Sequence, residues 1–286
     1  MTPGKIALLG DRGAVSVRGP DAEKLLQGLL TNDLARLTPQ RALFAALLTP
    51  QGKILFDFFI FLHGGAYLLD TAAAHAPQLA RRLEMYRLRS RVDISDDSAT
   101  YRVLATWGDA PGGGLADPRL PELGTRILLG PGSAAETAGQ FPINATEADY
   151  HAHRIALGVP EGGKDYAFGD TFPHEANFDL LAGVSFTKGC FVGQEVVSRM
   201  QHRGLARKRI VIVEADAALV SGNEVTAGAS KIGSIGSVAG NRALALVRLD
   251  RAEEAAAKGE TLAAAGRPLR LRIPDYLKSA VAADTA

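Results

Sequence analysis

The spacing of apolar residues predicts strands and helices in quick alternation through the first half of this 286-residue chain. Short apolar runs bounded by turn residues predict strands at 5–10, 13–19, 42–49, 53–62 and 65–71. Pro-Gln-Gly at 50–52 predicts a hairpin joining the third and fourth of these strands. Mixed strand and helix patterns with hairpins indicate an α+β fold with antiparallel pairing.

Two helices in this half are predicted from apolar residues at helical spacing. Leucines at 25, 26, 29 and 30 indicate a core-facing stripe on a helix over 19–34, which Pro20 and two early acidic residues would start. Leu79, Leu83 and Tyr86 indicate a second helix over 75–92, and Leu88 is expected on the same side.

The pattern changes after about residue 205. Before it come strands at 101–107 and 125–130 and a helix over 147–158 that Gly158 would end, while the Gly- and Pro-rich stretch 108–124 predicts a surface loop. After it, short strands recur at 207–216, 223–228, 231–240, 242–250 and 267–274, interrupted by a helix at 250–259. We therefore predict domains at 1–205 and 206–286, the second a small β-barrel followed by an alanine-rich tail.

Composition narrows the expected environment. The chain has 32 Lys and Arg against 31 Asp and Glu, so its net charge gives no reason to expect a nucleic acid or an anionic membrane as partner. The longest apolar run, 54–62, is interrupted by Asp57 and falls far short of the about 20 residues that a membrane span needs. With no pattern typical of a secretory signal at the N-terminus, we expect a soluble cytoplasmic protein.

The only cysteine, Cys190, lies in the polar sequence SFTKGCFVGQEVVSRM. One cysteine forms no internal disulfide and no four-cysteine metal site, so we expect no tightly held metal within one chain. Lys188 and a helix beginning near Gly193 would favour the thiolate and make this thiol nucleophilic, oxidisable or able to ligate a partner's metal. The alternative is a buried, inert cysteine, and local chemistry alone does not decide between the two.

Two further groups of polar residues stand out. His174, Glu175, Asn177 and Asp179 offer donors and acceptors to a heterocycle, or else form a polar loop that caps a helix. The second group is basic and is expected either to lie on a solvated helix face or to coat a groove for a polyanion; its members are Arg81, Arg82, Arg87, Arg89, Arg91, Arg203, Arg207, Lys208 and Arg209.

The sequences KGCFVGQE and RMQHRG resemble the signature of the YgfZ group, folate-binding relatives of the glycine-cleavage T-protein. The matching residues are Lys188, Gly189, Cys190, Gly193, Gln194, Glu195 and Arg203. LLQGLLTNDL, LLTPQGKILFDF, YRLRSRVDI and RIALGVPEGGKDYAFGDTFPHEANFD also resemble the group, so the likeness covers about residues 20 to 210.

This resemblance implies a three-lobed ring, in which two interleaved α+β lobes and a C-terminal β-barrel surround tetrahydrofolate or a one-carbon derivative. It implies support of iron–sulfur cluster assembly or repair in client enzymes, including tRNA-modification enzymes, and establishes no reaction. Cys190 would be the functional thiol, supported by Lys188, Gln194, Glu195 and Arg203 of the motif. The residues expected to contact folate are Asn32, Asp33, Gln51, Tyr86, Arg87, Arg91 and Glu175.

The chain departs from the T-protein at two polar positions. The hairpin that carries paired aspartates there has only Asp57 here, and Ala156 stands where the T-protein has a pterin-binding glutamate. Two alternatives to the cluster-related function follow. One is folate-dependent aminomethyl transfer with Asp57 as acid or base, although Asp57 could instead be a strand residue facing solvent. The other is a non-enzymatic adaptor binding RNA or a protein through its basic stretches.

Overall fold

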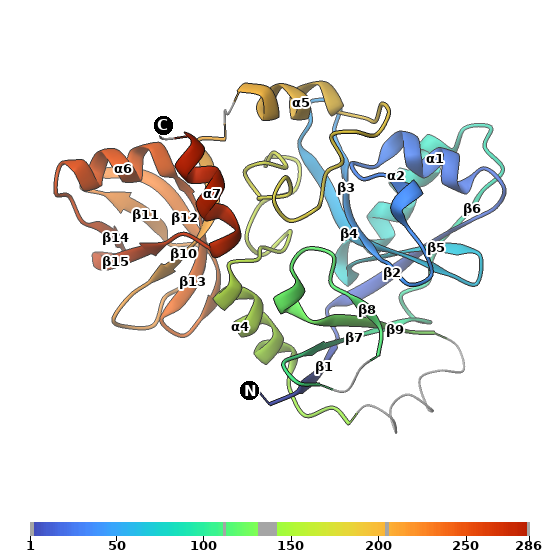
Figure 1. Ribbon diagram of the computed structural model, residues 1–286, viewed down its shortest axis with the longest axis horizontal. Coiled ribbons are helices and arrows are strands. Elements are labelled where there is room, and N and C mark those ends of the chain that lie inside the picture. Colours follow the sequence, from blue (N-terminus) through green and yellow to red (C-terminus); the bar gives the residue numbers. More distant parts are fainter. Residues whose placement is uncertain (1–2, 111–112, 131–141, 204–205, 285–286) are drawn as a thin grey trace. The chain divides into compact units, whose positions relative to one another are not determined.

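The computed structural model describes residues 3–110, 113–130, 142–203 and 206–284 (Figure 1). The chain forms two compact units, and each is built from segments that are separate in the sequence. The first unit contains residues 1–150 and 181–194, and the second contains 151–180 and 195–286. The chain therefore passes from one unit to the other three times.

A five-stranded sheet is the larger of the two sheets in the first unit. In order across the sheet its strands are β3 Leu43–Leu48, β4 Ile54–His63, β5 Ala66–Ala72, β2 Arg12–Arg18 and β6 Asp93–Asp96. The predicted hairpin joins β3 to β4, with Ala45 paired to Phe58. Because strand side chains alternate between faces, Phe56, Phe58 and Ile60 enter one core cluster, whereas Phe59 faces the opposite side.

Two helices, α1 Ala22–Leu29 and α2 Ala76–Arg87, contribute leucines to that core. Leu26, Leu29 and Leu30 are buried as the stripe predicted, but α1 ends well before residue 34. The expectation for Leu88 is wrong. It follows the last residue of α2 with φ +47° and is 87% exposed, because the chain turns away from the core there.

The second sheet of the first unit has four strands in the order β1 Lys5–Leu9, β7 Arg102–Trp107, β9 Thr125–Leu129 and β8 Leu115–Ala116. Strand β8 lies inside the stretch predicted to be a surface loop. That prediction is wrong at Asp117 and Arg119, which are buried and joined by an ion pair of 2.8 Å. Glycine and proline content identifies a segment without long regular elements, but it does not show that two of its charges pair in the interior.

A buried group of charges joins the two sheets. Asp70 on β5 accepts Arg12 Nε at 2.6 Å and pairs with Arg126 of β9 at 3.0 Å. The Arg126 guanidinium also stacks on Phe59, with its Cζ 3.9 Å from the ring centre. Buried charges are tolerated when they are paired and hydrogen-bonded, and here the pairing fixes one sheet against the other.

The second unit contains a closed six-stranded barrel, so the predicted β-barrel and the α+β class are confirmed. Around the barrel the strands are β10 Lys208–Glu214, β13 Arg242–Arg248, β12 Ser230–Ala239, β11 Glu224–Ala227, β14 Leu262–Ala264 and β15 Arg267–Arg272. Helix α6 Leu249–Ala257 follows β13 as expected. The tail that was expected to be only alanine-rich contains a further helix, α7 Asp275–Asp284, which places Leu277 in the barrel core.

The remaining regular elements are helices α4 Glu147–Leu157 and α5 Gln194–Arg203, and 3₁₀ turns at Leu34–Arg36, Ala73–His75 and Pro121–Leu123. Gly158 ends α4 as predicted, with φ +80°, and a Cβ at this position would lie only 2.4 Å from Pro274. Among the described residues, no helix has the length and apolar content to span a membrane.

Candidate functional site

Cys190 is exposed in a loop of the first unit, residues 181–193, which we call the thiol loop. The start of this loop is held by the turn that follows α1. Ser185 N donates to Thr31 O at 2.9 Å, and Thr31 Oγ1 donates to Gly183 O at 2.6 Å. The side-chain amide of Asn32 donates to Ala182 O at 2.7 Å. These bonds explain why α1 ends before the predicted residue 34, since Thr31 and Asn32 form hydrogen bonds with the thiol loop instead of continuing the helix.

Lys188 inserts its side chain beneath the thiol loop. The ammonium donates to the backbone carbonyls of Gln27 at 2.8 Å, Leu30 at 2.6 Å and Asn32 at 2.9 Å. The last carbonyls of a helix have no partner within the helix, so Lys188 supplies donors at the carboxyl end of α1. Burial lowers the pKa of Lys188 to about 8, although the Asp33 carboxylate opposes this fall. All three ammonium N–H groups are used, so Lys188 has no N–H left to donate to the thiolate.

The far end of the thiol loop is fixed by Gly193. Its φ is +80°, and a Cβ at this position would lie 2.6 Å from Thr49 O and 3.0 Å from Gly52 Cα. The loop therefore lies directly against the β3–β4 hairpin, which only glycine permits. Helix α5 begins at the next residue, so the predicted helix start is confirmed. Phe191 is buried, and its N–H donates to Gln194 Oε1 at 3.3 Å.

Cys190 thus lies between two fixed points, Lys188 on one side and the buried Phe191 with Gly193 on the other, and is itself exposed. The exposure of Cys190 shows that its thiol is not buried. Glu195 is on the exposed surface of α5 and pairs with Arg199 one turn later. Arg203 is the last residue of α5, and its side chain lies outside the described part of the chain.

Within the first unit, the residues predicted to contact folate do not converge at one point. Asn32 and Asp33 follow the carboxyl end of α1, where Asp33 accepts Gln27 Nε2 at 2.9 Å and Ala35 N at 3.2 Å. These bonds, led by the one from Gln27, lower the pKa of Asp33. Gln51 is exposed in the β3–β4 turn.

The other predicted contacts in the first unit lie near α2. Tyr86 packs partly buried against the core, and Arg87 pairs with Glu84 on the helix surface. Arg91 donates its backbone N–H, at 2.8 Å, and Nε, at 3.2 Å, to Asp21 at the amino end of α1. Arg91 and Asn32 therefore flank opposite ends of a helix of eight residues, which is about 12 Å long.

The polar group around residue 175 lies in the second unit. Glu175 accepts the Phe172 N–H at 2.9 Å, and Asp179 receives both arms of Arg209 at 2.7 and 2.9 Å. Arg209 is buried, so its assignment to a basic surface is wrong. Burial lowers the pKa of His174, whose Nε2 lies 3.0 Å from Gln201 Oε1. These contacts support the interpretation as a hydrogen-bonded loop.

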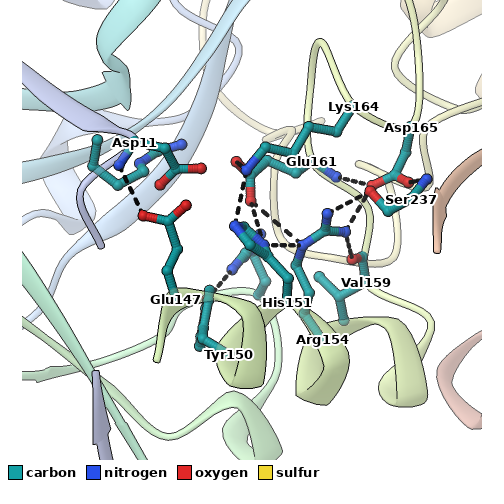
Figure 2. A network of polar contacts seen from close by, with 12 residues as sticks. Asp11, Glu147, Tyr150, His151, Arg154, Val159, Glu161, Lys164, Asp165 and Ser237 are labelled. Carbon is teal, nitrogen blue, oxygen red and sulfur yellow. Dashed lines mark hydrogen bonds and ion pairs between the residues drawn. The ribbon is translucent and has the colours of Figure 1, made fainter. Parts of the chain in front are cut away.

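Sequence patterns missed the polar network of Arg154, which Figure 2 shows between His151, Asp165 and Ser237. Arg154 Nη1 donates to Asp165 at 2.7 Å and Nη2 to Ser237 of β12 at 2.6 Å. His151 Nδ1 accepts Arg154 Nε at 2.9 Å. An arginine four residues after Tyr150 on the apolar side of a helix was the available sign.

Asp57 does not face solvent. It lies within β4, paired across the ladder with Ala46, and is 4% exposed. The solvent-facing alternative is therefore wrong.

Comparison with known proteins agrees with this architecture. Residues 10–111 match the GCVT N-terminal domain, and residues 207–279 match the CAF17 C-terminal beta-barrel domain. A solved structure, the glycine cleavage system aminomethyltransferase T from Bartonella henselae, superposes with a TM-score of 0.74 over 96% of this chain and 86% of that one. At 18% identity this likeness shows the fold alone, and it confirms the T-protein-like prediction.

Sequence relatives are more informative. The human iron–sulfur cluster assembly factor IBA57, mitochondrial, is 33% identical over 275 residues, covering 84% of this chain and 76% of the human protein. The chain belongs to the IBA57 family. The Mycosarcoma maydis IBA57 homolog is 38% identical over 229 residues, 72% of this chain and 56% of that protein. The chain spans a little over half the length of the fungal IBA57 relatives.

The IBA57 relatives also correct one prediction. Their names place them in the mitochondrion, so the predicted cytoplasmic location is wrong.

Proposed function

We propose that this chain acts in the assembly or repair of iron–sulfur clusters, with Cys190 as its functional thiol. The observation that carries the proposal is the exposed thiol held between Lys188 and Gly193. The names of the IBA57 relatives, as iron–sulfur cluster assembly factors, support the same role. A thiol that must meet another molecule benefits from exposure and from a fixed backbone, because less conformational entropy is lost on contact.

The thiol would act together with a second molecule. An iron–sulfur cluster is usually held by four cysteine thiolates, and this chain contains one cysteine. Cys190 would therefore provide one ligand, or one exchanging thiol, to a cluster whose other ligands belong to a cluster-assembly protein or a client enzyme. Radical-type tRNA-modification enzymes are proposed as clients.

Tetrahydrofolate, or a one-carbon derivative, is proposed as the cofactor, as in the YgfZ group whose signature the thiol loop resembles. The proposed contacts are Asn32, Asp33, Gln51, Tyr86, Arg87, Arg91 and Glu175. Arg87 and Arg91 would bind the carboxylates of the glutamate tail, since arginine suits carboxylates. An extended ligand suits the separation of Arg91 from Asn32 along α1.

The thiol is tested by Cys190→Ser in cells that lack the native protein, with the activity of a cluster-dependent enzyme as the readout. We expect this activity to be lost. The free energy of unfolding of the purified variant should stay within about 0.5 kcal/mol of the wild-type value, because an exposed side chain contributes little stability. Thr187→Ala, an exposed change in the same loop, serves as control and should retain activity. Wild-type activity of Cys190→Ser would refute the proposed thiol.

The cofactor is tested by calorimetry with reduced tetrahydrofolate. Cys190→Ala should bind like wild type, whereas Arg91→Ala should bind at least about tenfold more weakly because one charge-assisted contact is lost. Arg270→Ala is the matched control, since Arg270 (78% exposed side chain) and Arg91 (77%) are equally exposed and each pairs with one aspartate. The absence of binding to wild type would refute the folate proposal and leave the thiol proposal standing.

A further inference from the structure

A groove of about 880 Å³ lies between α1 and the turn after α2 in the first unit. We call it the α1 groove. The residues that line it are Asp21, Lys24, Leu25, Gly28, Leu29, Leu88, Arg89 and Ser90. Four of them belong to α1, and together with Asp21, which immediately precedes the helix, they recur at spacings of three and four, so one side of α1 faces the groove. Neither the cluster-related thiol nor the hydrogen bonds of the thiol loop use this side of α1.

Two large apolar side chains are exposed at or beside the α1 groove. Leu88, in its wall, is 87% exposed, and Met85, one helical turn earlier, is 68% exposed. Leu88 also has φ +47° and ψ −108°, a backbone conformation that leucine rarely adopts. Strained residues concentrate at functional sites, and this leucine gains no packing within the chain in return for its strain.

Gly28 lies inside α1 and lines the α1 groove. Glycine is unfavourable within a helix, and a Cβ at this position would meet nothing within 4 Å. The packing of this chain therefore does not require glycine there. A second backbone passing close to α1 would require it, since the absence of a side chain lets two chains approach.

The surroundings of the α1 groove are basic. Residues 21–30 and 76–91 together contain six basic and three acidic side chains. The acids are already engaged, Asp21 by Arg91, Glu84 by Arg87 and Glu23 by the Tyr67 hydroxyl.

Lys24 and Arg89, which line the α1 groove, form no ion pair with any carboxylate of the described residues. An apolar groove with unpaired cations is complementary to apolar residues flanked by carboxylates.

We propose that the α1 groove binds an acidic amphipathic helix of a partner protein. Such a helix would place its apolar face on Leu25 and Leu88 and pass close to Gly28, in the helix-in-groove mode. Its carboxylates would meet Lys24 and Arg89.

The α1 groove adjoins the anchor of the thiol loop. Lys188 binds the carbonyls of Gln27 and Leu30, which flank the groove residues Gly28 and Leu29. A partner seated on α1 is therefore held beside the loop that presents Cys190. That the partner is a cluster-assembly protein or client rests on the proposed function; the docking itself does not.

The docking is tested by fluorescence anisotropy on the full chain with three labelled helical peptides of equal length. The first has a leucine face flanked by glutamates, the second has lysines in place of the glutamates, and the third has serines in place of the leucines. We expect the first to bind with a dissociation constant tighter than about 1 mM and each of the others to bind at least about tenfold more weakly.

Variants locate the binding surface. Leu88→Ser should weaken binding of the acidic peptide at least about tenfold. Val220→Ser, at an apolar residue of the second unit that is 60% exposed, should leave the affinity for this peptide unchanged. Gly28→Ala gives two effects of opposite direction. It should raise the melting temperature by about 2–4 °C, because alanine favours the helix. It should also weaken binding of the acidic peptide, because the added methyl group fills the space through which the peptide backbone would pass close to α1.

Several results would overturn the proposal. They are equal binding of the three peptides, no binding of the acidic one, binding that Leu88→Ser leaves intact, and Gly28→Ala binding as well as wild type. Dimerisation in sedimentation velocity that Leu88→Ser abolishes would assign the groove to a second copy of this chain. Leu88-dependent retention on phosphatidylserine vesicles would assign it to a membrane. None of these assays involves Cys190, folate or a cluster, so the docking can fail while the proposed function holds, and the reverse.

Discussion

Lys188→Met tests whether the lysine of the motif anchors the thiol loop or acts on the thiol. Methionine keeps the length of the side chain and its apolar contacts but removes the ammonium. Three backbone carbonyls, those of Gln27, Leu30 and Asn32, then lose their donor. If Lys188 anchors the loop, the variant loses stability; if Lys188 serves the chemistry of Cys190, it does not.

The magnitude follows from the contacts. A hydrogen bond to a charged group contributes about 1.5–3 kcal/mol, so three bonds to Lys188 contribute at most about 9 kcal/mol. The pKa of Lys188 falls from 10.5 to about 8 on folding, which corresponds to an opposing cost of about 3 kcal/mol for burying the ammonium. The difference of about 6 kcal/mol is an upper limit. We expect Lys188→Met to lower the free energy of unfolding by about 2–4 kcal/mol, because the three bonds share one ammonium and methionine packs well.

Urea denaturation of both proteins at pH 7 measures this difference. A matched loss in Lys188→Arg is also expected, since a planar guanidinium does not direct three donors at three converging carbonyls. The rate of Cys190 alkylation is recorded on the same samples. Lys188→Met with wild-type stability and slowed alkylation would refute the anchoring role and assign Lys188 to the thiol.

The pH dependence gives an independent check. Because the pKa of Lys188 is lower in the folded state, the unfolded chain binds more protons between pH 8 and 10.5. Stability then rises with pH in this window, by up to about 3 kcal/mol from this group alone. The gap between wild type and Lys188→Met should therefore widen from pH 8 to 10.5, and a constant gap would contradict the lowered pKa.

Three further predictions concern stability measured by denaturation. Gly193→Ala should cost about 1–3 kcal/mol because of its positive φ and the blocked approach to the hairpin, whereas Gly189→Ala, with open space around it, should change stability by less than about 1 kcal/mol. Asp70→Asn should cost about 3–5 kcal/mol because it breaks a buried pair, and Asp216→Asn, on an exposed pair, under about 1 kcal/mol; equal losses would contradict this account. The lowered pKa of His174 means that stability falls as pH drops below 6.5, and His174→Gln should flatten that part of the profile.

Local patterns predicted the regular elements well and the thiol site only in part. The β3–β4 hairpin, the barrel strands and the start of α5 follow from turn residues and apolar spacing, which act over a few positions. The contacts of Lys188 join residues about 160 positions apart, and no periodicity records such a pairing. The sequence therefore indicated that this lysine matters as a charge near the thiol, but it did not predict that the ammonium also binds the carboxyl end of α1.

Polar residues inside the fold were the hardest to predict. Asp117 and Arg119 lie in a Gly- and Pro-rich stretch that is typical of surface loops, yet they neutralise each other in the interior. Arg154 of α4 is fully buried and pairs with Asp165. In each case the partner that makes burial tolerable is fixed by the tertiary fold.

The interleaving of the two units has a consequence for biogenesis. A ribosome releases residues 1–150 first, then thirty residues of the other unit, and only then the segment 181–194 that completes the first unit. Until that segment emerges, the carbonyls at the end of α1 lack the hydrogen bonds that Lys188 donates in the folded protein. The nascent first unit therefore cannot finish folding before Cys190 has been synthesised. A truncated chain that ends before Cys190 would contain an incomplete first unit, which is open to proteolysis. Proteolysis of incompletely folded chains would therefore also remove chains that lack the thiol.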